Sequence, residues 1–244
     1  HFPDVEVTFK LTVRAKNLPL ALIIREEDLR RELDHAQGLM YDESELAYIS
    51  GLRVDGKVMF GASDEYIERL RQSKLPPYKL ERVGTTYELE FTGNWFDVSD
   101  WEMYALAIIN ELKSRAIAAH MSDVELNVYY SRATDRQYTN LVTLRDTTSI
   151  SFMNFGLRRH ESFWWEKQAC EMACEVMDAR FTGISTTSLA MELAKEAKGT
   201  NAHELIMVIM ALASVLGPEA MRLALHDVIP KWEPLFHGRL LVML

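Results

Sequence analysis

The segment of this chain best suited to chemistry is the hexapeptide Gly199–Glu204, which reads GTNAHE and lies between a short strand-like run and a long apolar helix. Backbone N–H groups converge at the first turn of a helix, where they bind phosphate and other anions. His203 falls on that first turn. We therefore expect it to meet a bound phosphate group or to accept a phosphoryl group itself, although a lone histidine on a helix is usually structural.

A pair of adjacent arginines, Arg158 and Arg159, follows the apolar run Ile150–Phe155. Guanidinium groups bind carboxylate and phosphate oxygens through paired hydrogen bonds, so the pair suits an anionic substrate. Adjacent arginines are also common as plain surface charges. Both explanations stay open at this point, because the choice depends on what lies beside the pair in the fold.

A third polar cluster consists of Gly183, Ser185 and Thr186, at the end of the run Phe181–Ile184. A glycine placed before the start of a helix lets backbone N–H donors approach an anion closely. Such glycines are also typical of simple turns, and Ser185 and Thr200 are equally suited to be ordinary helix N-caps. We interpret the cluster as part of an anion site because it follows a strand in the same way as the arginines do.

Three strand-like runs position these clusters, since each cluster follows directly on one of them. Ile150–Phe155 is continuously apolar, which is typical of a strand buried on both faces. The runs alternate with predicted helices, and that order favours a parallel sheet or barrel whose strand ends share one mouth. All three clusters should then face that mouth. The predicted elements of this half are strands at Ile150–Phe155, at Phe181–Ile184, before Gly199 and at Arg239–Leu244, and helices at Glu161–Ala179, Thr187–Glu196, Ala202–Leu216 and Pro218–Asp227.

The first half of the chain has a different character. Apolar and polar residues alternate over Val5–Val13 and again over Tyr87–Phe91, a period of two that predicts half-buried strands. Ser99–Glu102 has the pattern of a capping box that opens a helix through about Ala119, and Asn127–Asp146 is polar and stays unassigned. We predict an α/β protein with one domain over residues 1–145 and a second over residues 146–244. Further helices are expected at Arg25–Asp34, Asp42–Leu52 and Ser63–Gln72.

The end of the chain bears on how much of a barrel it contains. Four strands cannot close an eight-stranded barrel, and the chain stops at the tip of the fourth, where such a barrel carries catalytic loops. We therefore expect the chain to be part of a longer protein.

Composition and motifs argue against several classes of protein. The formal net charge of -9 disfavours nucleic-acid binding, which needs a basic face. Cys170 and Cys174 are the only cysteines, too few for a disulfide framework or a zinc site, and they fit a reducing cytosol. No apolar run reaches the roughly 18 residues of a membrane span. The sequence contains no P-loop, dinucleotide-binding or nucleophile-elbow motif, and Met207 stands where a zinc protease needs its second histidine.

Taken in order, the three clusters resemble the motifs of nicotinate phosphoribosyltransferases, which are type II phosphoribosyltransferases. Phe155–Ser162 (FGLRRHES) is similar to the family's FGTRRRxS segment, Phe181–Thr186 (FTGIST) to its FxGTSN turn, and Lys198–Glu204 (KGTNAHE) to its GTxAHE motif. The opening HFPDVEVTFKLTVR and the pair Trp101-Glu102 resemble segments of the family's N-terminal domain. The resemblance covers essentially the whole chain.

The resemblance implies an enzyme that joins nicotinate to phosphoribosyl pyrophosphate, forming nicotinate mononucleotide and pyrophosphate in NAD salvage. It implies ATP hydrolysis through a phosphohistidine at His203, with Mg²⁺ accompanying the phosphate substrates. Thr200 would contact nicotinate, while Arg158 and Arg159 would bind anions beside the Gly183–Ser185 turn. The implied fold is an α+β N-terminal domain followed by part of an irregular α/β barrel. The implied protein is a cytoplasmic homodimer with its active site at the subunit interface.

The sequence also departs from the family's pattern. Leu157 replaces a threonine before the arginine pair, and Thr186 replaces an asparagine, which leaves the contacts of the second turn open. The family's D-x-Y-K motif, expected upstream, and its DTFG and RxDSGD motifs, expected downstream, lie outside this sequence. These residues alone are therefore expected to be inactive. Two alternatives stay open: a non-catalytic fragment or interaction module of the same fold, and a relative that prefers nicotinamide or quinolinate.

Overall fold

The computed structural model describes residues 5–11, 18–54, 57–58, 64–199, 203–224 and 226. The chain divides into two compact units, one made of His1–Met40 with Ser73–Lys198 and the other of Tyr41–Gln72 with Gly199–Leu244. Each unit therefore joins stretches that are far apart in the sequence. The mixture of helices and strands confirms the predicted fold class, and the boundary predicted after residue 145 stays a prediction.

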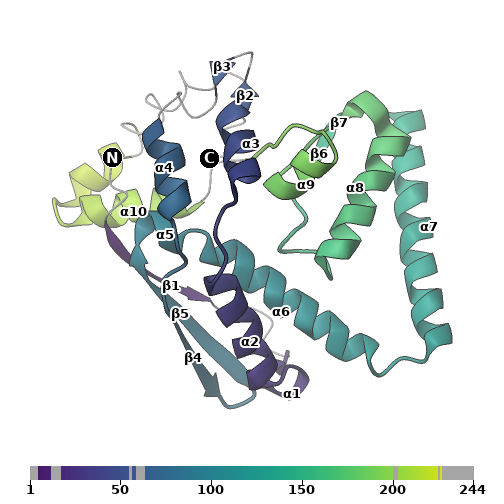
Figure 1. The fold of residues 1–244 in the computed structure, drawn as a ribbon, viewed down its shortest axis with the longest axis horizontal. Helices are drawn as coiled ribbons and strands as arrows, with labels where there is room; N and C mark the ends of the chain where they lie inside the picture. The colour runs from purple at the N-terminus through teal and green to yellow at the C-terminus, as the bar shows by residue number, and fades with distance from the viewer. Residues whose placement is uncertain are drawn as a thin grey trace. The chain divides into compact units, whose positions relative to one another are not determined.

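The first unit contains a three-stranded antiparallel sheet in the order β1-β5-β4 (Figure 1). β1 spans Glu6–Leu11, β4 spans Tyr78–Val83 and β5 spans Thr86–Asn94. Gly84 closes the tight turn between β4 and β5 with a φ of 61°, in the left-handed region that favours glycine. The strands predicted from alternating residues are confirmed as β1 and β5. β4 was not predicted, because Leu80 is its only buried residue.

Four helices belong with this sheet: α1 (Leu20–Ile23), α2 (Glu26–Gln37), α5 (Trp95–Val98) and α6 (Trp101–Ala118). Trp101 fixes the start of α6. It is fully buried, its ring stacks on Phe91 with 4.6 Å between centroids, and its indole N–H donates to the carbonyl of Pro76 at 2.8 Å. The predicted capping box at Ser99 is wrong. Because α5 immediately precedes α6, the Ser99 hydroxyl donates to the carbonyl of Trp95 at 2.7 Å instead.

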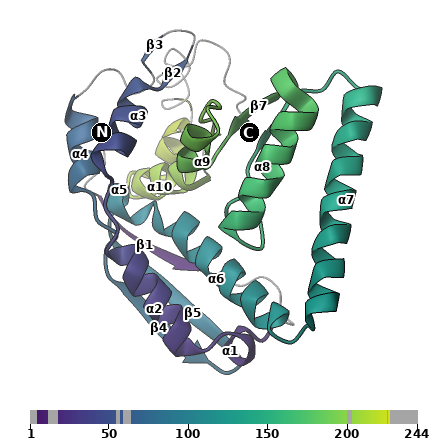
Figure 2. The same ribbon diagram turned by 45° about the vertical axis from the view of Figure 1, so that its right-hand side comes forward.

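α7 (Asp123–Thr147) is a helix of 25 residues that covers the stretch left unassigned from the sequence. It opens on a capping box, in which the Glu125 N–H donates to the Ser122 hydroxyl at 3.3 Å and the Ser122 N–H donates to the Glu125 carboxylate at 2.8 Å. α7 packs against α8 (Phe163–Met177), and Figure 2 shows the two helices side by side. Only Leu141 of α7 is buried, so its apolar stripe is too narrow to recognise in the sequence.

A parallel pair of strands supports the predicted site. β6 (Phe152–Asn154) and β7 (Phe181–Ile184) run parallel, with α8 and the short 3-10 turn η1 (Asp178–Arg180) between them in the chain. The prediction of parallel strands joined by a helix is confirmed for this pair. β7 lies in a small core that it shares with α8 and α9 (Thr187–Glu192).

Three predictions about these elements need correction. The strand expected at Ile150–Phe155 has only three residues, all half-buried, since β6 pairs with β7 alone among the described strands, and Ile150 is 54% exposed. The strand expected before Gly199 is reduced to one parallel bridge between Ile184 and Ala197. The helix expected to reach Glu196 ends at Glu192, because Ala194 adopts a left-handed φ of 49°. The strand predicted at Arg239–Leu244 lies outside the described residues.

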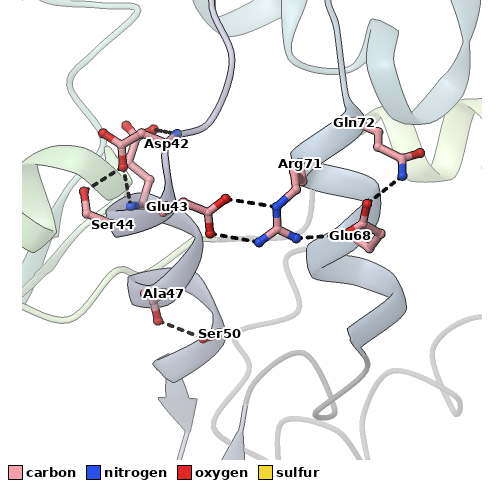
Figure 3. A network of polar contacts seen from close by, with 9 residues as sticks. Asp42, Glu43, Ser44, Ala47, Ser50, Glu68, Arg71 and Gln72 are labelled. Carbon is pink, nitrogen blue, oxygen red and sulfur yellow. Dashed lines mark hydrogen bonds and ion pairs between the residues drawn. The ribbon is translucent and has the colours of Figure 1, made fainter.

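The second unit contains short strands and helices: α3 (Glu43–Gly51), β2 (Arg53–Val54), β3 (Lys57–Val58), α4 (Asp64–Gln72) and α10 (His203–Ser214), with residues 218–224 also helical. Arg71 of α4 binds Glu43 of α3 through hydrogen bonds of 3.0 and 2.9 Å, and it also reaches Glu68 at 2.7 Å (Figure 3). These charges are exposed, so they orient the two helices more than they stabilise them. Ser63, the predicted start of α4, lies outside the described residues. Throughout the described part of the chain, no helix is long and apolar enough to cross a membrane.

Candidate functional site

The arginine pair lies in a tight turn, Gly156–His160, directly after β6; we name it the arginine turn. The side-chain oxygen of Asn154 accepts from the Gly156 N–H at 2.6 Å. The Gly156 carbonyl in turn accepts from the N–H groups of Arg159 and His160, at 2.6 and 2.9 Å. A Cβ atom at position 156 would collide with the His160 ring and with Oδ1 of Asn154, so a larger residue there would displace these side chains.

Arg158 is half-buried and is held at two points by α6. Its guanidinium pairs with the Glu102 carboxylate, and the Asn110 amide donates to the Arg158 carbonyl at 2.7 Å. Burial lowers the pKa of Arg158, and the neighbouring charge of Arg159 lowers it further. Arginine nevertheless stays protonated. A bound anion would offset the repulsion between the two guanidinium groups, in addition to the Glu102 carboxylate that already pairs with Arg158.

Sequence reasoning missed the supporting residues Glu102 and Asn110. They stand eight residues apart on α6, a spacing that places two side chains on the same side of a helix. Polar residues at this spacing could have indicated a shared contact. They could not have indicated the partner, because Arg158 lies 56 and 48 residues further along the chain.

Arg159 differs from Arg158 because it lies at the surface. Its guanidinium donates to the carbonyl of Phe155 at 2.9 Å, across the same turn. The two arginines therefore do not form a single fork. One is half-buried and fixed by α6, whereas the other extends along the outside of the turn, so an anion would meet them as two separate contacts.

The second cluster, Gly183–Thr186, consists of the last two residues of β7 and the bend that follows them; we name it the glycine turn. The Ser185 N–H donates to the carbonyl of Asn154 at 2.9 Å and so joins the ends of β6 and β7 directly. The structure thereby brings the arginine turn and the glycine turn together at one edge of the parallel pair. Ser185 itself is half-buried, and Gly183 is buried.

Gly183 is expected to be intolerant of a side chain. A Cβ atom there would lie 2.7 Å from the carbonyl oxygen of Glu196 and 2.8 Å from Cδ of Lys198. Gly183→Ala should therefore lower the free energy of unfolding by about 1–3 kcal/mol, measured by urea titration. Gly51→Ala is the matched control, because its Cβ would meet no atom within 4 Å. Equal unfolding midpoints for Gly183→Ala and the wild type would contradict the close packing.

A buried carboxyl group adjoins the glycine turn. Glu166 and Thr186 are the two buried polar or charged residues in the described part of the chain, and the Thr186 hydroxyl donates to Glu166 Oε1 at 2.8 Å. Burial raises the pKa of Glu166, and this rise is opposed by hydrogen bonding from Thr186 and from the backbone N–H groups of Leu157 and Gly156. Oε2 is buried and has no hydrogen-bond partner.

Glu166→Gln is expected to change how stability depends on pH. Below the unfolded-state pKa of about 4.3, the Glu166 carboxyl is neutral in both states, so the variant and the wild type should be equally stable. As pH rises through the higher folded-state pKa, ionisation costs the wild type stability that the variant keeps. Thermal melts from pH 4 to pH 7 should therefore show a growing advantage for Glu166→Gln. Cys170, one turn further along α8, stays protonated in this range because burial, and then the Glu166 charge, raise its pKa to about 12. Parallel pH profiles for the two proteins would contradict the expectation.

The third predicted cluster belongs to the second unit. His203 is the first residue of α10 and is exposed, as is Gly199. Thr200 lies outside the described residues. The position of His203 on a first helical turn is confirmed, and its meeting with the arginine turn stays a prediction.

Comparison with known proteins shows which family the chain resembles. Residues 1–110 match the family model described as the nicotinate phosphoribosyltransferase (NAPRTase) N-terminal domain. The chain is also similar to the crystal structure of nicotinate phosphoribosyltransferase from Porphyromonas gingivalis, with a TM-score of 0.77 and 19% identity over 98% of this chain and 57% of that one. The corresponding enzyme from Vibrio cholerae gives a TM-score of 0.75 and 22% identity over 98% of this chain and 53% of that one. A putative nicotinate phosphoribosyltransferase from Saccharomyces cerevisiae gives a TM-score of 0.75 and 21% identity over 96% of this chain and 56% of that one.

These comparisons confirm the resemblance to nicotinate phosphoribosyltransferases and the fold that it implied. The likeness in fold extends over nearly the whole chain, beyond the residues that the family model matches. The chain spans between 53% and 57% of the length of these three solved structures.

Proposed function

From the family to which residues 1–110 belong, we propose that the protein is a nicotinate phosphoribosyltransferase of NAD salvage. It would join nicotinate to phosphoribosyl pyrophosphate, giving nicotinate mononucleotide and pyrophosphate. The pyridine nitrogen forms a bond to the anomeric carbon of the ribose. The bond from that carbon to the pyrophosphate oxygen breaks, and its electron pair leaves with pyrophosphate.

The proposal rests on one observation: the arginine turn and the glycine turn lie next to each other. Both follow the carboxyl ends of neighbouring parallel strands, which is where ligands bind in α/β sheets. Arg158 is held there by Glu102 and offers a half-buried positive charge. Phosphoribosyl pyrophosphate is strongly anionic, so fixed cations and turn N–H groups suit its recognition.

Most of the rate acceleration in this reaction would come from positioning the substrates and stabilising the charges of the transition state. Departure of pyrophosphate builds positive character at the anomeric carbon and negative charge on the leaving group. Groups fixed in advance stabilise such charges without reorganising. In the proposal Arg158 and Arg159 bind phosphate or carboxylate oxygens, Gly183 and Ser185 shape the neighbouring turn, and Thr200 contacts nicotinate.

His203 would couple ATP hydrolysis to substrate binding. A ring nitrogen of His203 takes the γ-phosphoryl group of ATP and releases ADP, and water later hydrolyses the phosphohistidine to inorganic phosphate. Within the described ranges no cluster of three or more His, Cys, Asp or Glu side chains is placed to hold a metal ion. In the proposal Mg²⁺ enters with the phosphate substrates, whose oxygens are the ligands it prefers. The proposed protein acts in the cytoplasm as a homodimer.

A competition assay on the protein as its gene encodes it tests this function. Phosphoribosyl pyrophosphate, ATP and Mg²⁺ are supplied with equal amounts of nicotinate, nicotinamide and quinolinate, and the mononucleotide products are identified by mass spectrometry. Nicotinate mononucleotide should be the main product. A preference for either of the other pyridines would overturn the substrate assignment. Absence of any mononucleotide would support a non-catalytic interaction module instead.

A further inference from the structure

Lys198 is a cation that the proposed chemistry does not use. It is the last residue of the first unit, and its side chain lies over the glycine turn. A Cβ atom at Gly183 would lie 2.9 Å from Cγ of Lys198 and 2.8 Å from its Cδ, so the lysine stem runs directly across the glycine. The ammonium group is two bonds beyond Cδ. It is therefore held close to the glycine turn.

The backbone fixes Lys198 at this place. The Ile184 N–H donates to the carbonyl of Glu196 at 3.0 Å, and the Lys198 N–H donates to the carbonyl of Ile184 at 3.1 Å. These two hydrogen bonds surround the parallel bridge between Ile184 and Ala197. Residues 196–198 therefore run alongside β7 and in the same direction.

The other edge of β7 is occupied by β6. The next residue of the chain, Ser185, donates its N–H to the carbonyl of Asn154, whereas Ile184 uses both of its backbone groups on the side of residues 196–198. Successive residues of a strand direct their hydrogen bonds to opposite edges, so β7 lies between β6 and residues 196–198. The arginine turn thus follows the segment on one edge of β7, and Lys198 ends the segment on the other edge. Cations stand on both sides of the glycine turn, at the carboxyl ends where α/β sheets bind ligands.

The ammonium group of Lys198 is already paired, but with an exposed partner. Its Nζ lies 2.7 Å from Oε2 of Glu196, whose side chain is 69% exposed. Such pairs contribute little to stability, because water screens them. The stem of Lys198 explains the packing on Gly183, and an apolar side chain of the same length would pack there as well. The positive charge can therefore be offered to an anion at little cost to the fold.

We propose that Lys198 binds a phosphate group of the ligand, on the side of the glycine turn opposite to the arginines. The identity of that ligand rests on the proposed function. Phosphoribosyl pyrophosphate carries a phosphate group at one end of its ribose and a pyrophosphate group at the other. A cation on each side of the glycine turn suits a ligand that is anionic at both ends, because each end then meets a charged hydrogen-bond donor.

Anion titration of Lys198→Met tests the proposal in the natural full-length protein. Methionine keeps an unbranched stem over Gly183 and removes only the charge. Pyrophosphate and ribose 5-phosphate, each with Mg²⁺, are titrated separately by calorimetry, so neither a pyridine nor turnover is needed. The variant should raise Kd for one of these two anions by about 10-fold, the usual effect of losing a charged hydrogen bond. A thermal melt checks that the variant folds.

Two further variants separate the ammonium group from its pairing with Glu196. Lys79→Met is the matched control, because Lys79 also pairs with a glutamate two residues along, Glu81, at 3.0 Å on β4. It should leave both Kd values unchanged. Glu196→Gln keeps Lys198 and removes the competing carboxylate, so neither Kd should rise. A rise in Glu196→Gln equal to that in Lys198→Met would show that the ion pair, and not the ammonium group, supports binding, which would overturn the proposal.

Kinetics then connect the anion to the reaction. Lys198→Met should raise KM for phosphoribosyl pyrophosphate about 10-fold and change kcat less. Unchanged Kd values for both anions in Lys198→Met, a wild type that binds neither anion, or an unchanged KM would each overturn the proposal. If the wild type binds these anions but makes no mononucleotide, the proposed function fails while the titrations still decide whether Lys198 binds phosphate.

Discussion

Arg158→Ala is expected to lower kcat/KM for phosphoribosyl pyrophosphate by about 100-fold, which corresponds to roughly 3 kcal/mol of lost transition-state binding. Arg158 is half-buried, and Glu102 and Asn110 hold it in place. A charge that is already held in place needs little reorganisation when the substrate binds. Its removal should therefore lower kcat/KM more than removal of a mobile surface charge does. Steady-state kinetics at varied phosphoribosyl pyrophosphate measure the effect.

The controls for Arg158→Ala separate its contact with substrate from its charge. Arg145→Ala removes the same charge from the end of α7, where the side chain pairs with Asp146 at 2.8 Å, and it should leave kcat/KM unchanged. Glu102→Gln keeps Arg158 but weakens its anchor, so its loss should be smaller. A thermal melt checks that each variant folds. If Arg158→Ala and Arg145→Ala have equal activity, the arginine turn is not the anion site.

His203→Asn is expected to abolish incorporation of acid-labile phosphate from γ-labelled ATP. Asparagine keeps a polar side chain at the start of α10 but has no ring nitrogen to accept a phosphoryl group. The stimulation of turnover by ATP should disappear with the label, because the coupling passes through that nitrogen. Measurement of both the label and the turnover rate, with and without ATP, distinguishes coupling from general damage to the site.

His120→Asn provides the comparison for His203→Asn. His120 is exposed in the turn after α6 and has no part in the proposed reaction. Its variant should take up label and respond to ATP as the wild type does. Acid-labile label that persists in His203→Asn would show that another residue carries the phosphoryl group.

The sequence predicted the elements whose periodicity is plain. The alternating pattern of β1 and β5 and the strand–helix–strand order of β6, α8 and β7 follow from where apolar residues recur. α7 was missed because one buried residue, Leu141, gives almost no apolar stripe. β6 was predicted too long, since a continuous apolar run does not reveal how many neighbours will cover a strand.

The candidate site was predictable in its residue types but not in its supports. The arginine pair and the glycine turn could be placed at strand ends from the order of residues alone. Glu102 and Glu166 could not be assigned to the site, because their partners Arg158 and Thr186 are 56 and 20 residues away in the chain. Long-range polar contacts leave no local pattern. The identity of the ligand was predicted from the resemblance to a family, because the charge pattern of this chain indicates only that an anion could bind.

A crystal structure of the natural full-length protein with phosphoribosyl pyrophosphate and Mg²⁺ tests the central claim most directly. The account predicts phosphate oxygens within about 3 Å of the Arg158 or Arg159 guanidinium, beside the glycine turn. Phosphoribosyl pyrophosphate bound elsewhere, with no contact to residues 156–160 or 183–186, would contradict it.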